Sequence, residues 1–90
     1  MIECKSGWEI VSFDGRVVER YHPNGASEHY HIDYLESAEI TTDRKGRHYL
    51  KINPKVHGGF NRFTSPELAP EEVPQAQALV DEVNRVIASR

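Results

Sequence analysis

The hydrophobic pattern changes its period once along this chain, and that change constrains the fold more than any other feature. Up to about residue 64, apolar and polar side chains alternate, as they do in strands with one buried face. Near the C-terminus the apolar positions follow one helical stripe: Ala76, Leu79, Val80, Val83, Val86 and Ile87. A helix of about 15 residues is marginal alone, so this stripe must pack on the sheet. We therefore predict a mainly β (α+β) fold closed by one C-terminal amphipathic helix.

The strongest local signal is a β-hairpin near the start of the chain. Residues 8–13 and 16–21 are rich in strand-forming side chains and are joined by Asp14-Gly15, a dipeptide that tolerates the positive φ of tight hairpin turns. The segment 28–34 then alternates strictly, with three apolar or aromatic residues on one predicted face: Tyr30, Ile32 and Tyr34. This period of two predicts a half-buried antiparallel strand.

The remaining elements complete a meander of six or seven short antiparallel strands that forms an open barrel. Further strands are predicted at residues 39–42, 47–52 and 60–64. A turn at Asp43–Gly46 joins the first two of these strands, and Pro54 ends the second because proline donates no hydrogen bond. The strands thus cover about residues 8–64, the connector 65–74 and the helix about 75–88. The helix core is predicted at Leu79, Val80, Val83 and Ile87.

Length and composition exclude several classes of protein. Ninety residues form one domain, 1–90, which is too small for a Rossmann domain, an α/β-hydrolase or a TIM barrel. No apolar run reaches the ~18 residues of a membrane span, and the N-terminus carries no signal-peptide stretch, so we expect a cytoplasmic protein. The single cysteine, Cys4, cannot form an internal disulfide.

Two segments and the terminal helix resemble small bacterial pleckstrin-homology-like (PH-like) domains. The stretch Gly7–Gly15 is similar to their opening hairpin, in which a strand reaches a Phe-Asp-Gly turn. The stretch Tyr30–Glu39 resembles their spaced apolar segment, with Leu35 and Ala38 at its last two apolar positions. The terminal helix occupies the place of the helix that plugs their open barrel. The resemblance spans about residues 6–88.

The resemblance implies a non-catalytic binding module, of a kind that binds peptides or proteins and in bacterial forms assembles into homo-oligomers. The lipid-binding members carry a basic run between their first two strands, where this chain has the acidic turn Asp14-Gly15. The expected partner is therefore another protein or a second copy of this chain. We predict no cofactor.

Charge is distributed unevenly along the chain. Its net charge is −3, but residues 1–43 carry three basic and nine acidic side chains, whereas 44–62 carry no acid. The alternative function is therefore an anion-binding module for a lipid headgroup, nucleotide or nucleic acid. Its candidate residues are Arg44, Lys45, Arg47, Lys51, Lys55 and Arg62. A solvated basic face is the competing interpretation. The opposite charges also predict head-to-tail self-association, in which the basic turn meets the acidic hairpin of the next copy.

Catalytic and metal-binding patterns are weak. One predicted strand face carries His29, His31 and Asp33, and His pairs with this spacing can bind Zn²⁺. A structural zinc site, however, requires four ligands. The segment His57–Phe60 is similar to the His-Gly-Gly oxyanion loop of esterases, but the sequence contains no Gly-x-Ser-x-Gly nucleophile elbow. We therefore expect this segment to be a glycine turn between strands. We therefore predict that the protein is not an enzyme and has no resident metal.

Overall fold

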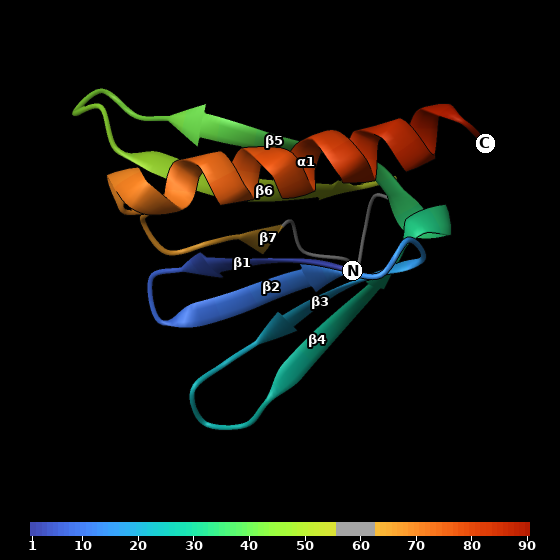
Figure 1. Ribbon diagram of the computed structural model, residues 1–90, viewed down its shortest axis with the longest axis horizontal. Helices are drawn as coiled ribbons and strands as arrows, with labels where there is room; N and C mark the ends of the chain where they lie inside the picture. The colour runs from blue at the N-terminus through green and yellow to red at the C-terminus, as the bar shows by residue number, and fades with distance from the viewer. Residues whose placement is uncertain (56–62) are drawn as a thin grey trace.

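Two antiparallel sheets and one C-terminal helix make up the computed structural model, which describes residues 1–55 and 63–90 (Figure 1). The first sheet has the order β1-β2-β3-β4, formed by β1 (Ile2–Ser6), β2 (Glu9–Phe13), β3 (Val17–Tyr21) and β4 (Ser27–His31). The second has the order β5-β6-β7, formed by β5 (Leu35–Thr42), β6 (His48–Pro54) and β7 (Phe63–Thr64). Both sheets are open, and α1 (Val73–Ala88) follows them. The predicted mainly β fold with one C-terminal helix is confirmed.

The predicted β2–β3 hairpin is present, but its turn differs in detail from the prediction. Gly15 has a φ of +100°, while none of the described non-glycine residues has a positive φ. Asp14 instead precedes the bend and accepts hydrogen bonds from the backbone N–H groups of Arg16 and Val17, both at 2.8 Å. The aspartate therefore stabilises the turn through its side chain, and glycine alone supplies the unusual backbone conformation.

The strand predicted at residues 28–34 ends earlier than expected. β4 stops at His31, and a short 3₁₀ helix, η1 (Ile32–Tyr34), leads directly into β5. The Asp33 backbone N–H donates to the His31 ring at 3.1 Å, which stabilises this bend. Because the bend interrupts the alternation, Ile32 is buried while the Tyr34 side chain is 58% exposed. The prediction that these two residues share one face is wrong.

A first strand, β1, was missed by the sequence pattern, which placed the first strand at residue 8. β1 pairs with β2 in the register Cys4 opposite Val11, and its inward positions Cys4 and Ser6 are buried. Ile2 and Cys4 face inward while Glu3 and Lys5 face outward, so the alternation contains only two apolar residues and is too short to predict a strand. The strand forms because β2 supplies its hydrogen-bond partner.

Helix α1 lies across the edges of both sheets, and its buried face completes the core. It begins at Val73, slightly before the predicted start, with Pro74 in the first turn where a missing N–H is tolerated. Leu79, Val80 and Val83 are buried as predicted, whereas Ile87 packs on the core from a partly exposed position. The preceding connector is also structured, through η2 (Pro70–Glu72) and the buried Leu68.

Candidate functional site at the free edge of strand β4

Strand β4 forms the outer edge of the first sheet, and its register shows which backbone groups are unpaired. The backbone N–H of His22 donates to Ala26, and that of Ile32 donates to Arg16, at 2.9 and 2.6 Å. In an antiparallel pair the hydrogen-bonded positions alternate, so the even-numbered residues of β4 face β3. The odd-numbered residues point their N–H and C=O groups away from the sheet: Ser27, His29 and His31.

This edge lacks several of the devices by which proteins usually protect a terminal strand, although Glu28 places one charged side chain on it. Residues 27–31 contain no lysine, no proline and no bulge, and their pairing with β3 is regular throughout. Within the described ranges 1–55 and 63–90, no strand pairs with the outer side of β4. Figure 1 shows β4 on the side of the molecule opposite to α1. The edge can therefore accept a further strand.

The β5 edge is closed by a side chain of the helix. The Asn84 amide accepts a hydrogen bond from the backbone N–H of Ala38 and donates one to its carbonyl, both at 2.9 Å. Ala38 points these groups away from β6, since its neighbour Glu39 lies at a hydrogen-bonded position opposite Lys51. At Ala38, one amide thus replaces the pair of hydrogen bonds that a neighbouring strand would make.

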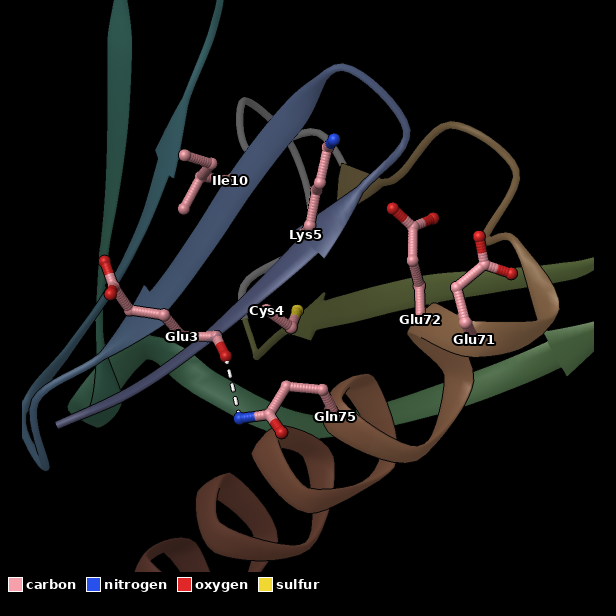
Figure 2. Close-up of a pocket in the computed structure, with 7 residues that line it drawn as sticks. All are labelled: Glu3, Cys4, Lys5, Ile10, Glu71, Glu72 and Gln75. Atoms are coloured by element: carbon pink, nitrogen blue, oxygen red, sulfur yellow. Dashed lines mark hydrogen bonds between the residues drawn. The ribbon is translucent and has the colours of Figure 1, made fainter.

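The β1 edge is covered in a similar way, around a surface pocket of about 340 Å³ (Figure 2). Gln75 of α1 donates to the Glu3 carbonyl at 3.0 Å. At the helix start, the Glu72 carboxylate accepts hydrogen bonds from the backbone N–H groups of Ala69 and Gly7, at 2.8 and 3.3 Å. This pocket is therefore built from groups that hold the helix against β1.

Cys4 lies in the wall of the same pocket, where a thiol could in principle act as a nucleophile. Burial, followed by the nearby Glu72 carboxylate, raises the pKa of the Cys4 thiol to about 11. The thiol therefore stays protonated near neutral pH and is a poor nucleophile.

A charged cluster fixes the position of β4 relative to the rest of its sheet. The Glu9 carboxylate is buried, and its Oε2 atom lies 2.8 Å from three nitrogens: Nε and Nη2 of Arg20 and Nδ1 of His22. Arg20 and His22 also reach Glu28 of β4, at 3.8 and 3.3 Å. The cluster links β2, β3, β4 and the intervening loop, so the free edge is held in one geometry. Among the described residues, the second Glu9 oxygen, Oε1, has no hydrogen-bond partner.

Tyr30 adds a second link within β4. Its hydroxyl donates to Glu28 at 2.6 Å, and this hydrogen bond is the main reason why the pKa of Glu28 lies below its usual range. Burial, and then the same carboxylate, raises the pKa of Tyr30 to about 12. Both groups keep their ordinary charge at neutral pH, so the inner side of the strand presents one carboxylate and one neutral ring.

The candidate metal residues are not brought together as a site. His29 and His31 do lie on the same outer face of β4, where His29 faces Glu19 at 3.5 Å. Asp33 lies beyond the strand on η1 and pairs with both His31 and Arg90. Across the part of the chain that the structure describes, no three His, Cys, Asp or Glu side chains are placed to hold a metal ion.

The candidate anion-binding residues are spread along the β5–β6 hairpin. Arg44 and Lys45 are exposed at its tip, whereas Lys51 lies within β6 and Lys55 follows it. Arg62 lies outside the described residues. Arg47 is bound by Asp43 at 2.7 Å, and hydrogen bonds led by the Arg47 backbone N–H lower the pKa of Asp43. The turn therefore contains its own carboxylate, Asp43, which forms an ion pair with one of the three clustered cations, Arg44, Lys45 and Arg47.

Sequence patterns could not have identified the β4 edge. Alternation located the strand itself, but the position of a strand at an edge depends on the order in which strands pair. The absence of lysine and proline between residues 27 and 31 does not help, because it is equally typical of an interior strand and of an unprotected edge.

Comparisons with known proteins do not identify this chain: no protein-family model, no curated protein and no solved structure matches it. No helix formed by the described residues is both long and apolar enough to cross a membrane.

Proposed function

We propose that this chain is a non-catalytic, PH-like interaction module that binds an extended segment of another protein or of a second copy of this chain along the free edge of β4. The observation that carries the proposal is the contrast among the sheet edges. Side-chain amides of α1 bond the backbone of β1 and β5, while the outward groups of β4 face no described strand. Strand addition uses such backbone groups for affinity and the flanking side chains for specificity.

The surroundings of β4 fit this use. The Glu9 cluster holds the strand in place before a partner arrives, so little conformational entropy is lost at the site on binding. The exposed side chains of Ser27 and His29 flank the outward backbone groups and offer polar contacts to a bound segment. The order of the elements, four strands, then three strands, then a helix, supports the PH-like part of the proposal.

An anion-binding function is less well supported. Phosphate recognition favours several converging cations, whereas Asp43 engages Arg47 within this turn. Lys51 also stands opposite Glu39 in the β5–β6 register. The described basic side chains therefore do not form a concentrated positive site.

The test is a selection of displayed random peptides against the wild-type protein, followed by binding of the selected peptides to two proline variants. His29→Pro removes an outward N–H of β4 without removing a hydrogen bond to β3, so it should abolish binding. Lys5→Pro is the matched control, because the Lys5 N–H points away from β2 at an edge that α1 covers. Peptides that bind wild type and Lys5→Pro but not His29→Pro would support the proposal. Equal binding to all three proteins would overturn it.

A further inference from the structure

We infer that the strand taken up by β4 is the β4 of a second copy of this chain, paired antiparallel about a twofold axis at His29. This inference rests on the proposed use of the β4 edge and names its partner. The outward-facing residues Ser27, His29 and His31 form a symmetric set, with one on each side of His29. Pairing about His29 matches Ser27 with the partner's His31 and uses every outward group of the strand.

The inner face of the strand selects this register over its neighbours. Pairing about His29 places Glu28 opposite the partner's Tyr30, which is a neutral hydroxyl-bearing ring. A shift of the axis to Glu28 would place the two Glu28 carboxylates opposite each other, and like charges in that position are destabilising. A shift to Tyr30 would leave Ser27 without a strand residue to pair with, because β4 ends at His31.

The other edges limit the assembly to two copies. A twofold contact uses the same surface on both partners and closes on itself. Helix α1 packs along the β1 and β5 edges and bonds the backbone of Glu3 and Ala38, and the described part of β7 is only two residues long. Pairing at β4 therefore gives a dimer and no filament, in contrast to the head-to-tail chain that the charge distribution predicts.

The experiment measures the oligomeric state of the full chain by sedimentation velocity over a range of concentrations. Wild type should pass from monomer to dimer as concentration rises. His29→Pro removes two symmetry-related hydrogen bonds at the axis, so its dimer Kd should rise by about 30-fold or more. Lys5→Pro should dimerise like wild type. A wild-type dimer that His29→Pro leaves unchanged would overturn the inference.

A cysteine variant tests the register without disturbing the strand. In His29→Cys the two new thiols face each other across the axis at a distance that a disulfide can span, so mild oxidation should link the two copies. His31→Cys should remain unlinked, because its neighbour is the partner's Ser27. The native Cys4 is buried and should not interfere. Linkage of His31→Cys in place of His29→Cys would contradict the register.

The two proposals fail separately. If wild type is monomeric at every concentration but selected peptides still bind the β4 edge, the inference of a β4–β4 dimer is wrong and the proposed interaction module is still supported. If the protein is monomeric and no peptide distinguishes His29→Pro from Lys5→Pro, the proposed function falls as well.

Discussion

Strands β5 and β4 each form the edge of a sheet, but the outward backbone groups of the two edges differ in their hydrogen bonding. At β5, Asn84 of α1 bonds both backbone groups of Ala38, so a helix side chain substitutes for a neighbouring strand. At β4, the corresponding groups of Ser27, His29 and His31 face outward, without a described strand beside them. The comparison shows that a single helix amide can satisfy the outward backbone groups of one edge residue, and that β4, which is far from the helix (Figure 1), has no such amide among the described residues.

The largest loss of stability should come from removing a core side chain of α1, the helix that covers the β5 edge. Leu79 lies on the buried face of α1 and is fully buried, so Leu79→Ala should lower the free energy of unfolding by about 2–5 kcal/mol. Urea denaturation measures this change. Gln77→Ala, at an exposed position of the same helix, is the control and should change stability by about 0.5 kcal/mol or less. Equal losses in the two variants would mean that the helix does not plug the core.

A pair of adjacent prolines should distinguish the two sides of β4. Tyr30 lies at a hydrogen-bonded position, so Tyr30→Pro removes a backbone bond to β3 and leaves its acceptor unpaired, which should cost about 1–3 kcal/mol. His29→Pro removes an outward N–H and should cost about 1 kcal/mol or less. The same urea titration compares them. A similar loss in both variants would show that the assigned register is wrong.

The closed edge can be opened with one substitution. Asn84→Leu leaves the Ala38 N–H and C=O without their partner, so stability should fall by about 1–3 kcal/mol. Hydrogen exchange of the Ala38 amide should accelerate in the variant relative to wild type. Gln75→Leu, which removes a single hydrogen bond at β1, is the control with a smaller expected loss. Unchanged exchange at Ala38 would show that the amide does not protect the β5 edge.

The smallest expected effect is a pH dependence of stability that arises from Tyr30 of β4. The pKa of Tyr30 is raised to about 12 in the folded protein, against about 10 when unfolded, so the neutral ring is favoured by folding. Its contribution to stability is complete below pH 10 and should be lost as the pH rises from 10 to 12. Urea denaturation of wild type and Tyr30→Phe at pH 9 and 11 isolates it. A decline of the same size in both proteins would assign the effect to other groups.

The sequence alone determined the local elements whose signals come from neighbouring residues. The β2–β3 hairpin follows from its turn residues, the β5–β6 turn from Asp43–Gly46, and α1 from the spacing of its apolar positions. These features depend only on short-range sterics, turn chemistry and hydrophobic periodicity, all of which can be predicted from residues close together in the sequence. The mainly β composition with one terminal helix followed from them.

Tertiary structure decided everything that depends on which distant residues meet. β1 has an alternation of only two apolar residues and is stabilised by its flanking elements, β2 and α1. The bend at η1 placed Tyr34 outside the core, and the fold brought Asn84 to Ala38 across 46 positions of sequence. The same pairing order made β4 an edge. Strand order and edge protection arise from long-range hydrogen bonds and packing, which no local pattern encodes.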